Sequence, residues 1–334
     1  MKILVTGAAG FIGFHLSQKL LGQGHEVVGL DALTSYYDPR LKQTRLELLK
    51  QKSGFSFGKI DLTDAVALEA FIADTKAEVV FHLAAQPGVR YSIENPQSYI
   101  QSNVVGTANL LETLRRHQPK HLIFASTSSV YGGNEIMPYA ETDRADSPLS
   151  LYAATKKSGE ALVHSYAHLW GIPATCVRFF TVYGAYGRPD MAPLKFATKI
   201  EAGAPIDVYG NGQMRRDFTY VDDLVAALEA IMPRVPAMGE PVEGDSLSAV
   251  APFRLLNIGG GRPVELMDFI ASLERAMGRK AELNMLPMQP GDVVATEADT
   301  ALLRALVGEL PSTPLDVGID RFVAWFRDYA KVAA

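Results

Sequence analysis

A glycine-rich turn near the amino terminus constrains the fold of this chain more than any other feature. Gly7 ends the apolar run KILVTG (2–7), and Gly10 and Gly13 open an amphipathic segment at 11–23. Glycines between a strand and a helix allow a tight turn, and they let a phosphate approach the N–H groups at the positive helix end. The G-x-x-G-x-x-G spacing therefore indicates a dinucleotide site, although a purely structural tight turn has the same pattern.

Short apolar runs alternate with longer amphipathic segments through the first half of the 334 residues. The strand-like runs lie at 26–31, 55–61, 78–85, 121–126 and 173–180, and helix-like segments at 64–75, 98–117 and 151–170 separate the later ones. This alternation predicts an α/β fold, a Rossmann-type doubly wound parallel sheet with both faces covered.

The second half of the chain has a different character, because Pro and Gly become frequent after residue 181 and the elements are shorter. We therefore expect a dinucleotide-binding domain at 1–180. A smaller α/β domain at 181–334 would bind mainly the substrate and return some segments to the first domain. The stretch 235–252 is rich in Pro, Gly and acidic residues and is expected to be a mobile surface loop.

Composition excludes several classes of function. The formal net charge is −5 and no basic stripe is interleaved with aromatic residues, so we expect no nucleic-acid partner. The amino-terminal apolar run is too short for a signal peptide or a membrane span. The single cysteine, Cys176, lies in a strand-like run and has no disulfide partner in the chain, which suits a reducing compartment. A cytoplasmic protein with no membrane partner and no metal is expected.

Residues at the ends of the next strand-like runs indicate which dinucleotide binds. Asp31 ends the second strand-like run, where a carboxylate can accept both ribose hydroxyls and repels a 2′-phosphate, which favours NAD over NADP. Lys42 and Arg45 are interpreted as solvated helix charges. Asp61 could hold the adenine amino group, or it could equally be a helix N-cap. The other predicted cofactor contacts are apolar or small residues beside these strand ends: Phe11, Ile12, Leu62, Leu83, Ala84 and Ala85.

The segment YAATK places Tyr152 and Lys156 four residues apart on a predicted helix, so that both side chains share one face. A phenol has a pKa of about 10. A neighbouring ammonium and the positive nicotinamide ring both favour the phenolate, which makes Tyr152 a usable base near neutral pH. Such a pair could occur by chance on a solvated face. Beside a dinucleotide site and the hydroxyl run at 126–129, a catalytic role is favoured.

Several motifs together resemble the extended short-chain dehydrogenase/reductase superfamily over nearly the whole chain. They are the glycine motif, STSSVYG (126–132), Y-x-x-x-K, NVVGTANLLE (103–112) and RRDFTYVDDL (215–224). Within that superfamily, YYD (36–38), GVRYS (88–92), RFFTVYGAYGRPDMA (178–192) and QPGDV (289–293) are most similar to UDP-glucuronate 4-epimerases. The resemblance implies tightly bound NAD, a catalytic set of Thr127, Tyr152 and Lys156, and a homodimer that pairs the helices at about 98–117 and 151–170.

The hydroxyl run also bears on the reaction. Similar dehydratases and decarboxylases carry a Glu where Ser129 stands; in a dehydratase such a carboxylate can remove the acidic C5 proton of a 4-keto sugar. The neutral hydroxyls of Ser128 and Ser129 can instead donate to the carboxylate of a uronic acid. Either serine could also merely cap a turn. Thr181 supports a uronate, because similar UDP-glucose 4-epimerases place Asn there.

The remaining substrate contacts are expected mainly from the resemblance. Arg188 carries a guanidinium suited to a carboxylate, but it could instead meet the pyrophosphate or pin its own loop. Arg216 would hold the diphosphate, Asp292 would accept from the uridine ribose, and Arg90 would contact the substrate. Asn103 is either a sugar-phosphate contact or a satisfied buried amide.

These features predict an NAD-dependent 4-epimerase that interconverts UDP-glucuronate and UDP-galacturonate through a 4-keto intermediate and transient NADH. Tyr152 would take the proton of the 4-hydroxyl with help from Thr127. Lys156 would hold the nicotinamide ribose and lower the tyrosine pKa. Three alternatives stay open: a 4-epimerase for UDP-glucose or UDP-N-acetylglucosamine, a UDP-glucuronate decarboxylase, and a non-catalytic NAD-binding regulator. Ser129 argues against the decarboxylase, and the catalytic set argues against the regulator.

Overall fold

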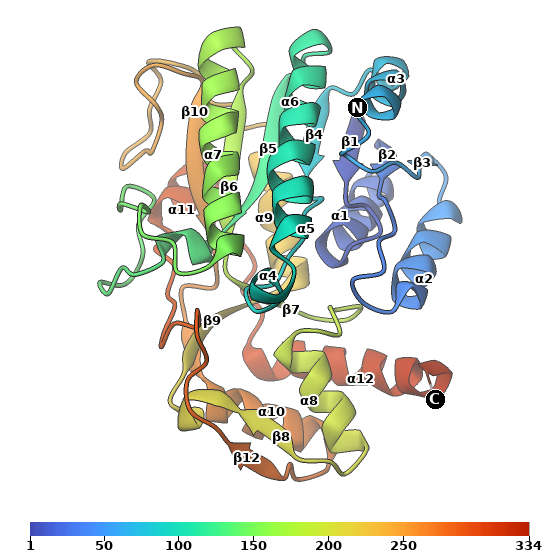
Figure 1. The fold of residues 1–334 in the computed structure, drawn as a ribbon, viewed down its shortest axis with the longest axis vertical. Coiled ribbons are helices and arrows are strands. Elements are labelled where there is room, and N and C mark those ends of the chain that lie inside the picture. Colours follow the sequence, from blue (N-terminus) through green and yellow to red (C-terminus); the bar gives the residue numbers. More distant parts are fainter. Residues whose placement is uncertain (334) are drawn as a thin grey trace.

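A seven-stranded parallel sheet forms the centre of the molecule (Figure 1). The structure is a computed structural model that describes residues 1–333. In the order in which they pair, the strands are β10 (Phe253–Ile258), β6 (Ala174–Phe179), β5 (His121–Thr127), β4 (Val79–His82), β1 (Lys2–Thr6), β2 (Glu26–Leu30) and β3 (Phe55–Gly58). The order reverses between β1 and β4, the kind of point at which open α/β sheets bind ligands. The predicted Rossmann-type fold is confirmed.

Helices cover both faces of the sheet, because successive side chains of each strand point to opposite sides. In β1, Ile3 and Val5 belong to one hydrophobic core and Leu4 to the other. The first core packs against α1 (Phe11–Gly22), α9 (Val221–Ile231) and α11 (Ala301–Val307). The second packs against α3 (Ala65–Thr75), α6 (Gly106–Arg116) and α7 (Leu151–Trp170).

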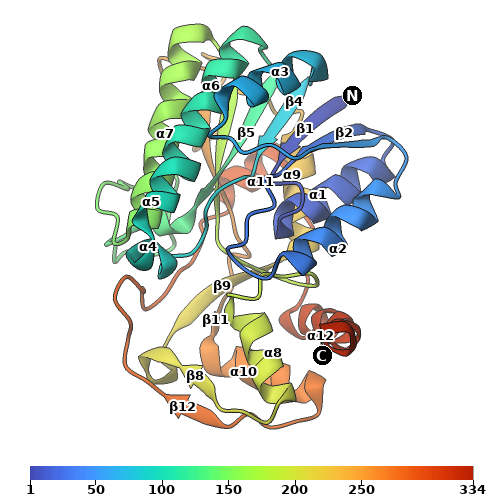
Figure 2. The same ribbon diagram turned by 45° about the vertical axis from the view of Figure 1, so that its right-hand side comes forward.

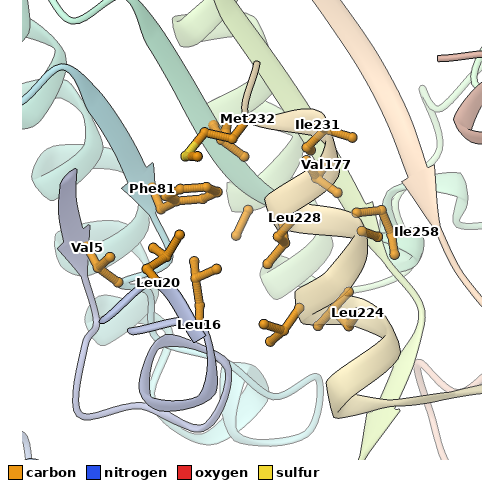
Figure 3. Packing of buried hydrophobic residues seen from close by; sticks show 14 of the residues in the cluster. Val5, Leu16, Leu20, Phe81, Val177, Leu224, Leu228, Ile231, Met232 and Ile258 are labelled. Carbon is orange, nitrogen blue, oxygen red and sulfur yellow. The ribbon is translucent and has the colours of Figure 1, made fainter. Parts of the chain in front are cut away.

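The first core joins segments from both halves of the chain. Figure 3 shows Leu16 and Leu20 of α1 in one cluster with Leu224 and Leu228 of α9. Strand β10 likewise extends the sheet beyond β6 although it follows residue 181. The second half of the chain therefore contributes elements to the central sheet and its covering helices.

The rest of the second half forms a smaller part below the carboxyl ends of the central strands (Figure 2). It has a three-stranded sheet of β11 (Pro263–Glu265), β9 (Arg215–Tyr220) and β7 (Thr181–Tyr183), and a pair of β12 (Leu283–Met285) and β8 (Ile206–Val208). A core of its own, including Phe269 and Phe322, packs α8 (Ala192–Glu201), α10 (Leu266–Met277) and α12 (Leu315–Ala333) against these strands.

Several element boundaries differ from those expected. Helix α7 spans the predicted residues 151–170, and its N-cap Ser150 accepts a hydrogen bond from the Ala153 N–H (3.1 Å). The strand expected at 55–61 ends at Gly58 in the structure, and the strand expected at 78–85 ends at His82. The predicted helix 98–117 is broken into α5 (Pro96–Tyr99), a π-helical turn (Ile100–Val105) and α6. The short α4 (Tyr91–Glu94) precedes them, and α2 (Pro39–Lys50) follows β2.

The loop at 235–252 is anchored at its second end, which corrects the expectation that it is mobile throughout. Asp245 accepts hydrogen bonds from Nε and Nη2 of Arg254 on β10, each at 2.8 Å, and both side chains are buried. Ser248 also bonds His164 of α7 (2.9 Å). Among the helices of residues 1–333, none has the length and apolar character needed to cross a membrane.

Candidate active site

A cavity of about 370 Å³ lies at the carboxyl ends of the central strands, against α8 and α12, and its volume suits a small-molecule site. The predicted cofactor and catalytic residues all line it: Gly7, Gly10, Phe11, Ile12, Gly13, Asp31, Asp61, Leu62, Leu83, Ala84, Ala85, Thr127, Tyr152 and Lys156. Four predicted substrate residues also line it: Ser128, Ser129, Thr181 and Arg188. The other three, Arg90, Arg216 and Asp292, lie outside its lining.

The glycine-rich turn has no room for side chains at its key positions. Gly7 has a φ of +72°, and a Cβ there would lie 2.8 Å from the Ala84 nitrogen. A Cβ on Gly13 would lie 2.1 Å from the Gly7 carbonyl oxygen. Gly10 is the N-cap of α1 and has no side chain to accept hydrogen bonds from the first turn. The N–H groups of that turn can therefore bind a phosphate. The turn therefore fits a dinucleotide pyrophosphate.

A Gly13→Ala variant is expected to lose bound NAD, because the new methyl group would overlap the Gly7 carbonyl and force the turn open. We expect NAD affinity to fall between about fivefold and about 150-fold, as overpacking costs about 1–3 kcal/mol. NAD released from the purified protein can be quantified by chromatography. Gly22→Ala is the matched control, since a Cβ at Gly22 of the same helix meets nothing within 4 Å. Equal NAD content in both variants would contradict the assignment of the turn.

Asp31 is held beside the glycine turn by main-chain donors. It accepts hydrogen bonds from Ala9 N (3.2 Å) and Leu33 N (2.8 Å), and the Lys42 ammonium lies 3.9 Å from Oδ1. The interpretation of Lys42 as a solvated charge is wrong, because it is 8% exposed and lines the cavity. Burial lowers the Lys42 pKa and the charge of Asp31 opposes this. A cation thus stands next to the predicted ribose carboxylate.

Arg45 is also not solvated, since its side chain is fully buried. Its guanidinium donates to the Ala9 carbonyl (3.0 Å) and to the Tyr186 carbonyl (2.6 Å). It also donates to the Tyr37 hydroxyl (2.8 Å). Arg45 therefore ties the glycine turn to the loop after β7, and the sequence alone could not reveal this because the covering loop is about 140 residues distant.

Asp61 and the residues after β4 also line the cavity. Asp61 is exposed, and its Oδ1 accepts from the Thr63 N–H (2.9 Å) and hydroxyl (2.8 Å). The N-cap of α3 is Asp64, which accepts from Ala67 N (3.0 Å), so the N-cap interpretation of Asp61 is wrong. Ala84 N donates to the hydroxyl of Thr6 (3.1 Å), which holds the ends of β4 and β1 together.

The hydroxyl run divides into residues with separate structural roles. Thr127 ends β5 and accepts a hydrogen bond from Ser129 N (3.2 Å), so the turn cap is Thr127 and not either serine. Its hydroxyl also lies 3.2 Å from the Ser129 hydroxyl. Ser128 and Ser129 are half-buried and line the cavity. Ser126 is buried below them and donates to Glu160 Oε1 (2.7 Å).

Tyr152 and Lys156 both reach the cavity from α7, but their side chains have different neighbours. The Tyr152 ring packs edge-on against Tyr99, with ring centroids 6.1 Å apart. Burial raises the Tyr152 pKa, while the charge of Arg188 and the hydroxyl of Thr127 act in the opposite direction. The Lys156 ammonium lies 4.5 Å from the centre of the Phe124 ring, and burial lowers its pKa to about 8. The charge of Arg188 therefore also favours the Tyr152 phenolate, a contribution that was not predicted from the sequence.

The three predicted substrate residues outside the cavity gather with one another. Arg90 pairs with Asp292 (2.9 Å) and lies over the Tyr209 ring, 4.4 Å from its centre. Arg216 donates to the carbonyls of Val293 (2.8 Å) and Val294 (3.0 Å). Burial lowers the Arg216 pKa and the charge of Asp292 opposes this.

Asn103 is a satisfied buried amide. Its side chain exchanges hydrogen bonds with the main chain of Gln86 (2.7 and 3.0 Å) and donates to the Thr155 hydroxyl (3.0 Å). The alternative of a sugar-phosphate contact is not supported, since both ends of the amide are engaged within the chain.

Residues 3–242 match the model of the NAD dependent epimerase/dehydratase family. The chain belongs to this family. The family expected from the sequence is therefore confirmed, and so is NAD as the expected cofactor.

Several members of the family align with this chain over nearly its whole length. A probable UDP-glucuronate 4-epimerase of Rhizobium meliloti is 52% identical over 98% of this chain and 97% of its own. UDP-glucuronate 4-epimerase 1 of Arabidopsis thaliana is 43% identical, over 98% of this chain and 77% of its own. The crystal structure of UDP-glucuronic acid 4-epimerase from Bacillus cereus, in complex with UDP-glucuronic acid and NAD, has a TM-score of 0.88 at 34% identity and covers 98% and 100% of the two chains.

A buried ion pair lies directly under the strand ends of this epimerase/dehydratase. Arg178 of β6 donates to both carboxylate oxygens of Glu160 on α7 (2.9 Å each), and the side chains are 1% and 3% exposed. Ser126 completes the cluster through its bond to Glu160. The pair was not predicted, although an arginine inside an apolar strand-like run signals a buried partner.

Proposed function

We propose that this protein is an NAD-dependent 4-epimerase that interconverts UDP-glucuronate and UDP-galacturonate. The observation that carries the proposal is the composition of the cavity around Tyr152: hydroxyls from Thr127, Ser128, Ser129 and Thr181, and the cation of Arg188. Of the described residues that line the cavity, only Asp31 and Asp61 are carboxylates; Asp31 lies beside the glycine turn, Asp61 follows β3, and both are predicted cofactor contacts. The relatives named UDP-glucuronate 4-epimerases support the same activity.

The cofactor would be held by the glycine turn, by Asp31 at the adenosine ribose and by Lys156 at the nicotinamide ribose. Bound NAD would supply a reversible hydride acceptor for C4 of the sugar, whose two faces are used in turn. Tyr152 removes the proton of the 4-hydroxyl and later gives a proton back to the C4 oxygen, so no net proton is consumed. Thr127 stabilises the Tyr152 oxygen while it carries the charge.

The hydroxyls and Arg188 serve the sugar carboxylate. A 4-keto uronic acid is a β-keto acid. It loses carbon dioxide when the bond between C5 and the carboxylate carbon aligns with the π system of the C4 ketone. Donors from Ser128, Ser129 and Thr181, with the guanidinium of Arg188, stabilise the anion and hold it out of that alignment. A base at the position of Ser129 is missing, so C5 keeps its proton.

Further parts of the proposal rest on the family resemblance. Arg216 contacts the diphosphate, Asp292 the uridine ribose, and Arg90 the substrate. Two subunits pair through the helices at about 98–117 and 151–170, which lie beside one another on one face of the sheet (Figure 1). The protein is cytoplasmic. Residues 1–180 form the NAD domain and 181–334 mainly the substrate domain.

A 4-epimerase for a neutral UDP-sugar is the second candidate, because Asp190 pairs with Arg188 and neutralises part of its charge. Two parallel incubations separate the candidates. Purified protein is mixed with UDP-glucuronate or with UDP-glucose, without added cofactor, and the nucleotide sugars are resolved by chromatography with mass detection. A new peak of unchanged mass that matches UDP-galacturonate is expected. A product lighter by carbon dioxide would mean a decarboxylase, and turnover of UDP-glucose alone would mean the neutral-sugar enzyme.

A further inference from the structure

Arg188 is held by two residues to which the sequence analysis assigned no role of their own. Its Nε donates to Asp190 Oδ1 (3.0 Å), and its Nη2 pairs with Asp190 Oδ2. The hydroxyl of Tyr36 donates to the same Oδ2 (3.1 Å). The three side chains therefore form a chain of contacts, from Tyr36 through Asp190 to Arg188, that we call the arginine clamp.

The arginine clamp joins distant segments at one wall of the cavity. Tyr36 lies between β2 and α2, and its ring packs against the ring of Tyr91 at 4.7 Å between centroids. Arg188 and Asp190 belong to the loop between β7 and α8. At Gly88, a Cβ would lie 2.9 Å from the Tyr36 oxygen and 3.7 Å from Arg188 Nη2. Tyr36 and Arg188 line the cavity, whereas Asp190 stands behind them.

The geometry of the pair decides what Arg188 can still bind. A guanidinium has five N–H donors in one plane. Asp190 engages the Nε side of that plane through two bonds, which fixes the orientation of the plane. The N–H groups on the opposite edge stay available to a ligand in the cavity. Burial would lower the Arg188 pKa, but the charge and hydrogen bonds of Asp190 raise it, so the guanidinium stays charged.

Resting on the proposed function, we propose that Asp190 and Tyr36 are positioning residues that fix the Arg188 guanidinium toward the carboxylate of a UDP-uronic acid and thereby set the affinity for it. A flexible arginine would lose side-chain freedom at each binding event, and a fixed one has lost it already. Asp190 needs its own support, because an aspartate bound only by Arg188 could rotate with it. The Tyr36 hydroxyl provides that support.

The test compares a ligand that reaches the arginine clamp with one that does not. KM for UDP-glucuronate and the inhibition constant of UDP are measured for the wild type, Asp190→Asn and Tyr36→Phe. UDP lacks the uronic acid and therefore has no carboxylate for Arg188 to bind. Asp38→Asn is the control, since Asp38 is an exposed carboxylate just after Tyr36 that pairs with Arg40 and does not line the cavity.

We expect Asp190→Asn to raise KM for UDP-glucuronate about tenfold, because it removes the charge that holds the guanidinium, and Tyr36→Phe about threefold, because it removes one supporting donor to Asp190. The inhibition constant of UDP should stay within about twofold of the wild-type value, and Asp38→Asn should match the wild type in both. If Asp190→Asn does not fold, Tyr36→Phe decides, because it removes a single hydroxyl.

Three results would overturn the proposal. An unchanged KM in a folded variant would mean that the clamp does not position Arg188. An equal rise in KM and in the UDP inhibition constant would mean that the substitutions only loosen the cavity. If the wild type does not convert UDP-glucuronate at all, the proposed function fails and the clamp with it. If the wild type converts it and the variants match, the clamp alone fails.

Discussion

Replacement of Tyr152 by phenylalanine is expected to lower kcat for epimerisation about a thousandfold while NAD stays bound, because a positioned general base contributes about 10²–10⁴-fold. The substitution removes only the phenol oxygen. The ring keeps its edge-on contact with Tyr99, and Lys156 keeps its position beside Phe124. The cavity should therefore hold both ligands and fail only at the removal of the 4-hydroxyl proton.

Two measurements on the same preparation separate this result from misfolding. Turnover of UDP-glucuronate is followed by chromatography, and NAD content is measured after denaturation of the protein. Tyr329→Phe serves as the control, since Tyr329 stacks on Trp325 of α12 outside the cavity lining and should give wild-type turnover. A Tyr152→Phe variant that keeps more than about a tenth of the activity would assign the proton to another group.

The residues that could be predicted from the sequence are those whose function depends on local spacing. Gly7, Gly10 and Gly13 belong to one turn, so their contacts follow from the backbone path. Tyr152 and Lys156 share a helix face because they are four residues apart. Both groups line the cavity as expected. The parallel sheet likewise follows from the alternation of short apolar runs and amphipathic segments.

The contacts that could not be predicted join segments far apart in the chain. Tyr36 and Asp190 are 154 residues apart, and Arg45 bonds a carbonyl 141 residues away. Spacing on α2 marks Arg45 as a helix charge but says nothing of the loop that covers it. The same limit applies to Tyr152: the helix face that it shares with Lys156 follows from their spacing, whereas the influence of Arg188 on its pKa comes from another loop.

The buried pair of Glu160 and Arg178 should matter most for stability. Removal of one partner leaves the other charge buried without compensation, which costs about 3–5 kcal/mol. Glu160→Ala is therefore expected to lower the free energy of unfolding by about that amount. Thermal unfolding followed by circular dichroism should show a midpoint lower by roughly 5 °C, at about 1.5 °C per kcal/mol for a chain of 334 residues. Since Glu160 also accepts from Ser126, the strand end that carries Thr127 should loosen as well.

Two further variants test whether burial of the charge is the cause. Glu47→Ala removes an exposed carboxylate that pairs with Lys50 on α2, and it should change stability by less than about 1 kcal/mol. A double variant, Glu160→Leu with Arg178→Met, removes both buried charges and keeps the volume, so it should recover much of the loss. If Glu160→Ala and Glu47→Ala unfold at the same temperature, the pair does not stabilise the fold. If the double variant is as unstable as Glu160→Ala, the loss comes from the broken contacts of Glu160 rather than from the unpaired charge of Arg178.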